Sequence, residues 1–348
     1  MHPVCGRYGC RGRALDKSIM KNILIVGGAG YIGSHMCKYL ANRGYRPLVL
    51  DNLICGHRAA VKWGPLLEGS AGNEDFLHRV FSEYPVDAVM HFAAFCYVGE
   101  SVENPAKYYE NNVSNTIALL KVMVERNVGN FIFSSSCATY GEPREIPICE
   151  DHPQRPINPY GRTKLMVEEI LADFRDAYGL AYVSLRYFNA AGADPGGELG
   201  EDHRPETHLI PLVLQTALGR RTHVEVFGDD YPTPDGTCVR DYIHIEDLAG
   251  AHFLALERLL NGGPGGQFNL GNGDGYSVKQ VLQTAGRVTG QAIPARIVAR
   301  RAGDPAILVG SSEKAFQELG WRPNLPELEA IVRTAWNWHK ANPAGYPA

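Results

Sequence analysis

Near the start of the chain an apolar run leads straight into a cluster of glycines, Asn22-Ile23-Leu24-Ile25-Val26-Gly27-Gly28-Ala29-Gly30-Tyr31-Ile32-Gly33. An apolar run without alternation predicts a strand that is covered on both faces, as in a parallel sheet. The residues that follow carry apolar side chains at helical spacing. Glycines between a strand and a helix permit a sharp turn and let a phosphate group approach the free amides at the helix N-terminus. Gly27, Gly30 and Gly33 are therefore candidate phosphate-binding residues.

An acidic residue, Asp51, follows about twenty residues after the glycines, at the end of the second expected strand. In a dinucleotide-binding fold, a carboxylate at this place hydrogen-bonds the adenosine ribose. The same carboxylate would repel the 2′-phosphate of NADP, so the expected cofactor is NAD. A plain turn between a strand and a helix also uses glycines, but the position of Asp51 favours the cofactor site.

Short apolar runs alternate with longer amphipathic stretches up to about residue 188. The expected strands are Asn22 to Val26, Pro47 to Leu50, Ala88 to Phe92, Phe131 to Ser134 and Tyr182 to Tyr187, and the expected helices are Ser34 to Asn42, Pro105 to Glu125 and Tyr160 to Tyr178. This alternation predicts an α/β fold with a doubly wound parallel (Rossmann) sheet. After residue 189, prolines and glycine pairs break the pattern, which predicts a smaller, mixed α/β domain.

These patterns also predict how the domains divide the chain. We expect a NAD-binding unit at 21–188 with a returning segment at about 237–262, and a substrate-binding unit at 189–236 and 263–348. Residues 1–20 are rich in glycine and arginine, and we expect a disordered leader in which Cys5 and Cys10 bind no metal. The first structured element begins right after Met20, which makes Met20 a candidate for the native start.

The overall composition argues against large charged partners. With 34 basic and 38 acidic residues the net charge is −4, so no global field attracts nucleic acid or an anionic membrane. The eight cysteines have neither the paired spacing of a zinc site nor the density of a secreted disulfide scaffold. No apolar run approaches the roughly 20 residues that span a bilayer. The sequence therefore predicts a cytoplasmic protein that acts on a small molecule and binds no metal.

A second chemical pattern is the pair Tyr160 and Lys164, whose spacing places both side chains on one face of a helix. A nearby ammonium stabilises a phenolate and lowers the pKa of the tyrosine, which makes the phenol usable as a base. Exposed pairs with this spacing are common on helices. Here, however, Ser136 follows an apolar strand and can orient a substrate hydroxyl toward the base. Ser136, Tyr160 and Lys164 are the candidate catalytic residues.

Taken in order, these segments resemble a known family. The glycine loop, Asp51, His91-Phe92-Ala93-Ala94, Asn111, Ser136 and the Tyr160/Lys164 pair occur in the order typical of the extended short-chain dehydrogenase/reductase family. Later segments are similar to those of its nucleotide-sugar 4-epimerases, namely Arg186-Tyr187-Phe188-Asn189, Gly228-Asp229-Asp230-Tyr231-Pro232, Asp235 to His244 and Asn269-Leu270-Gly271. The resemblance runs from about residue 21 to the C-terminus.

The resemblance implies an activity and a set of roles. The activity is NAD-dependent inversion of carbon 4 of a UDP-sugar, the interconversion of UDP-glucose and UDP-galactose, by transient oxidation to a 4-keto sugar and re-reduction. Besides the three glycines, the implied cofactor residues are Tyr31, Ile32, Asp51, Asn52, Ser70, Ala71, Phe92, Ala93, Ala94, Cys96, Asn111, Lys164 and Phe188. The implied substrate residues are Ser136, Tyr160, Asn189, His208, Leu209, Phe227, Arg240, Arg301 and Asp304. The resemblance also implies a homodimer that pairs the helices at Pro105 to Glu125 and Tyr160 to Tyr178.

Several positions depart from the family pattern. Ser70 stands where an aspartate usually contacts adenine, Cys96 where some members carry lysine, and His208 where some carry asparagine beside the diphosphate. Leu308 falls at a variable position that bounds the sugar pocket, so tolerance of N-acetylated sugars stays open. Gly310 replaces a more usual acidic residue, and the sequence offers no functional interpretation of it.

Three other functions compete with this interpretation. Thr139 to Pro143 and Asn158 to Tyr160 also resemble the corresponding segments of a UDP-xylose/UDP-arabinose 4-epimerase. A nucleotide-sugar 4,6-dehydratase needs an acid pair after the active-site hydroxyl, where this chain has Cys137 and Ala138. A non-catalytic NAD-sensing protein would keep the glycine loop and lose the Tyr/Lys pair, whereas this chain keeps both.

Overall fold

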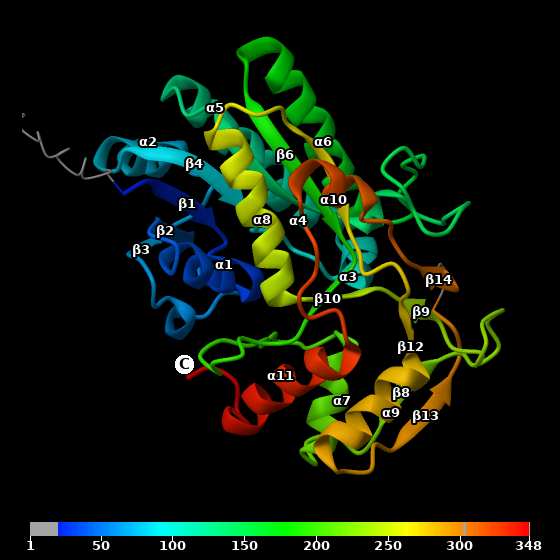
Figure 1. The fold of residues 1–348 in the computed structure, drawn as a ribbon. Helices are drawn as coiled ribbons and strands as arrows, with labels where there is room; N and C mark the ends of the chain where they lie inside the picture. Colours follow the sequence, from blue (N-terminus) through cyan, green and yellow to red (C-terminus); the bar gives the residue numbers. More distant parts are fainter. Residues whose placement is uncertain (1–19, 302–303, 348) are drawn as a thin grey trace, which may run out of the picture.

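The centre of the molecule is a seven-stranded sheet in which all neighbouring strands are parallel (Figure 1). The structure is a computed structural model and describes residues 20–301 and 304–347. In spatial order the strands are β11 (Gly266–Leu270), β6 (Ala181–Tyr187), β5 (Asn130–Ser136), β4 (Val86–His91), β1 (Asn22–Val26), β2 (Arg46–Asp51) and β3 (Leu66–Glu68). The predicted doubly wound parallel fold is confirmed.

Helices cover both faces of this sheet, which explains why its central strand β1 carries apolar side chains on both faces. Ile23 and Ile25 of β1 belong to a buried cluster that also includes side chains of α1 (Tyr31–Ala41), α8 (Ile245–Leu260) and α10 (Glu313–Leu319). Leu24 and Val26 point to the opposite face, where α2 (Glu74–Glu83), α5 (Asn115–Glu125) and α6 (Pro159–Tyr178) lie. All four side chains are fully buried, and such burial on two faces is the main source of stability for a parallel sheet.

The stretch expected as one helix, Pro105 to Glu125, is helical over these bounds, but its hydrogen-bond pattern changes in the middle. A short α3 (Val98–Glu103) precedes α4 (Pro105–Tyr109), a π-helical turn at Glu110–Ser114 follows, and α5 begins at Asn115. The buried Asn112 in this turn accepts from the amide of Phe95 at 2.9 Å and donates to the carbonyl of Phe95 at 3.0 Å. It also donates to the Thr163 hydroxyl of α6 at 3.1 Å. The turn therefore ties the loop after β4 to α6.

A smaller, mixed unit lies over the C-terminal ends of the strands. Its own hydrophobic cluster joins α7 (Leu209–Ala217), α9 (Val278–Thr289) and α11 (Leu328–Ala341). Its strands are β7 (Asn189–Ala191), β8 (Val224–Phe227), β9 (Val239–Arg240), β10 (Tyr242–His244), β12 (Tyr276–Ser277), β13 (Ala295–Val298) and β14 (Ile307–Leu308). They form small sheets of two or three strands, as expected for a region rich in prolines and glycines.

Two segments lie elsewhere than the sequence suggested. Val239–Arg240 (β9) and Tyr242–His244 (β10) were expected in the returning part of the NAD-binding unit, but they pair with strands of the smaller unit. Gly266–Leu270 was expected in the substrate-binding unit, but as β11 it pairs with β6 at the edge of the central sheet. The preceding α8 belongs to the segment expected to return, and it packs on the sheet. Most of the expected leader, including Cys5 and Cys10, is outside the described residues. Within the part of the chain that the structure describes, each helix falls short of the length and apolar character that crossing a membrane requires.

Candidate active site

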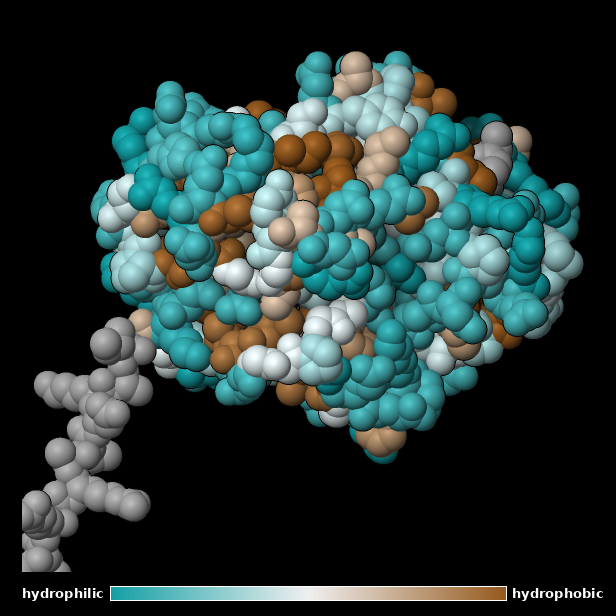
Figure 2. All heavy atoms as spheres, turned by 90° about the horizontal axis from the view of Figure 1, so that it is seen from above, coloured by the Kyte–Doolittle hydropathy of each residue, from teal (hydrophilic) through white to brown (hydrophobic). Residues whose placement is uncertain are grey.

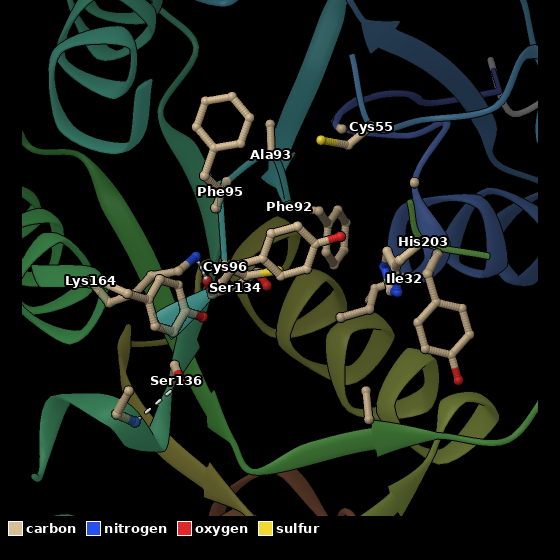
Figure 3. Close-up of a pocket in the computed structure, with 18 of the residues that line it drawn as sticks. Ile32, Cys55, Phe92, Ala93, Phe95, Cys96, Ser134, Ser136, Lys164 and His203 are labelled. Atoms are coloured by element: carbon tan, nitrogen blue, oxygen red, sulfur yellow. Dashed lines mark hydrogen bonds between the residues drawn. The ribbon is translucent and has the colours of Figure 1, made fainter. Parts of the chain in front are cut away.

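A cavity of about 470 Å³ lies where the carboxyl ends of the strands meet the smaller unit. Val26, Leu50 and Ser134, at or near the ends of β1, β2 and β5, line it from the sheet. Leu209 and Leu308 line it from the smaller unit. Ligands of doubly wound sheets bind at this end, because the loops there diverge and leave a crevice. Figure 3 shows side chains from both units pointing into this space.

The glycine loop turns so sharply that only glycine fits at two of its positions. Gly27 has φ +82°, and a Cβ there would lie 2.5 Å from the amide nitrogen of Ala93. A Cβ on Gly33 would lie 2.2 Å from the carbonyl oxygen of Gly27. At Gly30, the N-cap of α1, the nearest protein atom would be 3.4 Å away, so the fold itself tolerates a side chain far better there. A glycine is needed at that position if a phosphate must approach the backbone, as a dinucleotide requires.

Asp51 lies at the end of β2 and is held by the same loop. One carboxylate oxygen accepts from the amide of Ala29 at 2.9 Å and the other from the amide of Leu53 at 2.8 Å. Burial raises the pKa of Asp51, and these two amides oppose the rise. The carboxylate is thereby fixed on the cavity wall beside the glycine loop, as the prediction of a ribose-binding acid requires.

Lys164 and Tyr160 both reach the cavity from the first turns of α6, which begins because Asn158 caps it and Pro159 opens it. The ammonium of Lys164 is buried and donates to the carbonyl of Ser134 at 2.7 Å. Its Nζ lies 5.9 Å from the centre of the Tyr160 ring. Burial lowers the pKa of Lys164 to about 8. The predicted juxtaposition of the ammonium and the phenol is therefore present.

The expected effect of Lys164 on the phenol is not found in this arrangement. Burial raises the pKa of Tyr160 well above its usual value, and Cys96 and Tyr187 add to the rise, while the Ser136 hydroxyl opposes it. The main cause is desolvation of the phenol, and the Lys164 ammonium is engaged by the carbonyl of Ser134. Lys164 by itself therefore does not make Tyr160 a base near neutrality. The expectation also counts on the positive charge of the nicotinamide, and it stays a prediction.

Ser136 ends β5 and faces the same cavity. Its hydroxyl oxygen accepts from the amide of Ala138 at 3.2 Å and caps a 3-10 turn at Cys137–Thr139 (Figure 3). The hydroxyl proton is therefore free to bond a ligand. The next strand supplies Tyr187, whose hydroxyl bonds Ser134, so the two strand ends are linked side by side.

The structure brings most of the predicted site residues together. All of the candidate cofactor residues line this one cavity, as do the catalytic candidates Ser136, Tyr160 and Lys164. Of the candidate substrate residues, Asn189, His208, Leu209 and Asp304 line it as well.

Three candidates, Phe227, Arg240 and Arg301, are not part of the cavity wall. The Arg301 guanidinium stacks on the Phe227 ring at 3.9 Å, and Arg240 forms an ion pair with Asp304, which does line the cavity. Arg240 is thus connected to the wall through Asp304, and the exposed Arg301 covers Phe227.

Two departures from the family pattern find structural explanations. A Cβ on Gly310 would lie 2.2 Å from the Phe188 ring, so no larger residue fits at position 310 while Phe188 keeps its place on the cavity wall. Leu308 lines the cavity, as expected of a residue that bounds the sugar pocket.

Sequence reasoning missed other residues of the wall, among them Tyr187, Glu201 and His203. The signal for the last two was available in the segment Glu201-Asp202-His203-Arg204-Pro205-Glu206-Thr207-His208, in which acids and histidines alternate at short spacing. Histidine and glutamate in a sequence do not indicate a binding site unless the fold brings them together. The family resemblance drew attention to His208 alone.

Because a glycine turn, a ribose-binding acid and a buried Tyr/Lys pair meet in one cavity, the fold and site define a dinucleotide-dependent enzyme of the oxidoreductase type. The chain matches the model of the NAD dependent epimerase/dehydratase family over residues 23–271, and it belongs to that family. NAD is therefore the cofactor, as Asp51 predicted.

Curated and solved relatives extend this similarity over almost the whole chain. The chain is 56% identical to a UDP-glucose 4-epimerase of Halalkalibacterium halodurans, with 93% of this chain and 97% of that protein covered. A crystal structure of a UDP-glucose 4-epimerase superposes with a TM-score of 0.93 at 52% identity, covering 94% of this chain and all of the other. The Brucella ovis UDP-glucose 4-epimerase in complex with NAD superposes with a TM-score of 0.89 at 54% identity, covering 91% of this chain and 97% of the other.

Proposed function

We propose that the protein inverts carbon 4 of a UDP-sugar and interconverts UDP-glucose and UDP-galactose. The observation that carries the proposal is the meeting of Ser136, Tyr160 and Lys164 in the cavity that the glycine loop and Asp51 also line. The names of the relatives, which share more than half of their residues with this chain, support the same reaction.

In this proposal the chain's own residues move one proton and hold the sugar. Tyr160 takes the proton of the 4-hydroxyl onto its phenol oxygen, and Ser136 orients that hydroxyl. NAD, when bound, supplies the reversible acceptor for the two electrons and the hydrogen of carbon 4. The sugar is then a ketone at carbon 4, and it presents its other face before Tyr160 returns the proton. Asn189, Leu209 and Asp304 would hold the UDP-sugar from the opposite wall while the 4-keto sugar rotates to present its other face.

The raised pKa of Tyr160 fits this sequence of events if positive charge arrives with the cofactor. Lys164 does not by itself stabilise the phenolate enough. The oxidised nicotinamide is a cation, and a cation near a buried phenol favours its ionised form. The base would then form only in the complex in which it is needed.

The decisive experiment is to incubate the purified protein with UDP-glucose and UDP-galactose, without added NAD, and to resolve the products. Conversion in both directions is the expected result, and an unchanged sugar with each substrate would reject the proposal. UDP-xylose and the N-acetylated UDP-sugars belong in the same assay, because a pentose 4-epimerase is the competing function and Leu308 alone does not decide between them. A 4-keto-6-deoxy product would instead indicate a dehydratase.

We also propose a homodimer, which rests on the family resemblance and on the surface of α6. The helices α5 and α6 lie side by side on the outside of the molecule, and α6 exposes Met166 and Tyr178. Figure 2, which views the molecule from the side of these helices, shows hydrophobic side chains at the surface between hydrophilic ones. Light scattering that reports only monomer at micromolar concentration would reject the dimer. We further propose that the chain divides into a cofactor-binding and a substrate-binding unit, and that it acts in the cytoplasm in galactose metabolism.

A further inference from the structure

Four side chains that offer metal-binding atoms gather at one edge of the cavity. They belong to Glu201, His203, Glu206 and His208, in the loop that leads from β7 to α7. One ligand atom from each residue lies within 4.8 Å of all the others. Among the residues that the structure describes, this is the one cluster of three or more such groups.

The distances within the cluster suit a single small cation. Atoms bound at about 2.0–2.2 Å to a tetrahedral ion lie about 3.4 Å from one another. The Nδ1 atom of His203 is 3.3 Å from Glu201 Oε1 and 3.5 Å from Glu206 Oε2. The Nδ1 atom of His208 is 2.5 Å from Glu201 Oε1 and 3.9 Å from Glu206 Oε1. The separations from His203 are therefore those that a tetrahedral ion requires, whereas the His208 Nδ1 is hydrogen-bonded to Glu201 Oε1 and must move away from it to join the same ion.

The His203 Nδ1 atom is not aligned with either neighbouring carboxylate as a hydrogen bond requires. This is expected of a metal ligand and not of a histidine in an ordinary ion pair. The Nδ1 atom of His203 is buried and makes no hydrogen bond, although two carboxylate oxygens lie within 3.5 Å. A buried nitrogen without an aligned partner loses the bond that it would make in water. An ion between the three groups would satisfy the nitrogen lone pair without requiring a linear hydrogen bond.

Burial and charge point in the same direction. The side chains of Glu201 and Glu206 are only 4% and 5% exposed, and two buried carboxylates need two positive charges nearby. A divalent ion between neutral imidazoles supplies them. Two protonated histidines would supply these charges as well. Burial lowers the pKa of His203 and so disfavours the protonated form, but the carboxylates of Glu201 and Glu206 outweigh burial and raise that pKa to about 11. Protons and a metal ion are thus the two possible occupants, and the misaligned Nδ1 of His203 favours the metal.

We propose that Glu201, His203, Glu206 and His208 bind one divalent transition-metal ion of the zinc class. A set of two imidazoles and two carboxylates is typical of zinc and its neighbours, and the separations suit four-coordination. Glu206 is already oriented, because its Oε1 accepts from the amides of Thr207 and His208 at 2.8 Å each, which leaves Oε2 toward His203. The spacing of the cysteines gave no sign of such a site.

The ion has a positioning role and takes no part in the proton transfer. His203 lies beside Ile32 and across the cavity from Lys164 and Ser136 (Figure 3). The Tyr31 ring meets the His203 ring edge-on at 6.3 Å, and His208 is the N-cap of α7, whose first residue, Leu209, lines the cavity. The ion therefore fastens the loop between β7 and α7 next to the glycine loop.

The test is metal analysis of the purified, cofactor-loaded protein after incubation with zinc sulfate and removal of unbound zinc. The expected result is one zinc per chain. His203→Ala and Glu201→Gln each remove one ligand and are expected to weaken zinc binding at least about 100-fold, since even partners behind the ligands change affinity 10–100-fold. His223→Ala is the matched control, because His223 lies outside the cluster and its Nδ1 contacts Thr222. It should bind zinc like the original protein.

Cobalt(II) bound to the original protein tests the geometry without any substitution. A tetrahedral site gives an intense visible absorption, and an octahedral site a weak one. The proposal is overturned if the original protein retains no zinc, if the variants and the control retain it equally, or if the cobalt spectrum is octahedral. Because two of these outcomes concern the original protein alone, a variant that fails to fold does not leave the proposal untested.

Discussion

The two walls of the cavity are built in different ways. On the sheet wall, backbone groups hold the functional side chains: the carbonyl of Ser134 holds Lys164, the amide of Ala138 holds Ser136, and the amides of Ala29 and Leu53 hold Asp51. Backbone in a buried parallel sheet moves little, because every strand is paired and covered on both faces.

On the loop wall, side chains hold one another. Asp304 of this wall pairs with Arg240 and Glu201 with His208, and outside the wall Arg301 stacks on Phe227. Long charged side chains have many conformations, and loops have more freedom than strands. The difference suggests that the sheet wall performs the chemistry, which needs fixed geometry, and that the loop wall binds the substrate, which needs adaptability. Substitutions on the two walls should therefore change different kinetic constants.

Among the substitutions on the two walls, Tyr160→Phe on the sheet wall should cause the largest fall in turnover. The substitution removes the oxygen that carries the proton and leaves the ring, so turnover should fall by about 100-fold to 10,000-fold. Binding of NAD and UDP-sugar should stay close to that of the original protein. Steady-state kinetics with calorimetric binding would measure both.

A Tyr160→Phe variant with nearly full turnover would contradict the assignment of the chemistry to Tyr160 and the sheet wall, because another group would then carry the proton. A variant that loses binding as much as turnover would contradict the division of roles between the walls, since the sheet wall would then serve binding. Tyr178→Phe is the matched control, because Tyr178 is an exposed tyrosine at the end of the same helix.

Below the sheet wall, a buried ion pair fixes α6 to the strands. Glu168 accepts from Arg186 at 2.5 Å and from Ser135 at 2.5 Å, and both charged side chains are almost completely buried. Glu168→Gln would leave the Arg186 charge without its partner, which typically costs about 3–5 kcal/mol in the free energy of unfolding. Urea denaturation would measure the loss.

The control for Glu168→Gln is Glu329→Gln, which breaks an exposed pair with Arg333. Exposed pairs of this kind contribute little, so the free energy of unfolding should hardly change. Equal effects of the two substitutions would show that the network under α6 is no more rigid than the surface.

Arg240→Ala should act on the loop wall and change binding. If Arg240 turns from Asp304 to the diphosphate of a UDP-sugar, its loss removes a charged hydrogen bond of about 1.5–3 kcal/mol, which corresponds to a KM about 10-fold to 100-fold higher. Turnover at saturation should change little, because the contact is the same in the ground state and the transition state. Arg221→Ala, at an exposed position, is the control. A fall in turnover with unchanged KM would place Arg240 with the catalytic groups.

The two walls also differ in how far the sequence predicted them. The strand Asn22 to Val26 was predicted residue for residue, and the other four expected strands agree with the structure to within two residues at each end. Burial on both faces leaves a continuous apolar run that local sequence reveals. Asp51, Ser136 and Lys164 follow such runs or caps at fixed spacing, so their meeting could be predicted as well.

The features that sequence missed depend on contacts between distant segments. The π turn at Glu110–Ser114 forms around Asn112, whose partners are Phe95 and Thr163. The strand Gly266–Leu270 is polar in part and is defined by its pairing with β6. Neither Arg240 nor Glu201 has a local pattern that tells which partner it contacts. The missed features are therefore those in which one side chain selects another across the fold.

The smallest predicted effect concerns the charge of Lys164 and the pH dependence of stability. Burial lowers the pKa of Lys164 to about 8 in the folded protein, against 10.5 for an unperturbed lysine. Between these two pH values the unfolded chain binds the proton that the folded protein has released. The free energy of unfolding should therefore rise with pH in this window, by at most about 1.4 kcal/mol per pH unit. Lys164→Met lacks the titrating group, so the difference between the original protein and the variant, both freed of dinucleotide, should grow from pH 8 upward. Urea denaturation at successive pH values would measure it, and parallel profiles would show that Lys164 titrates normally and that the sheet wall does not enclose its ammonium.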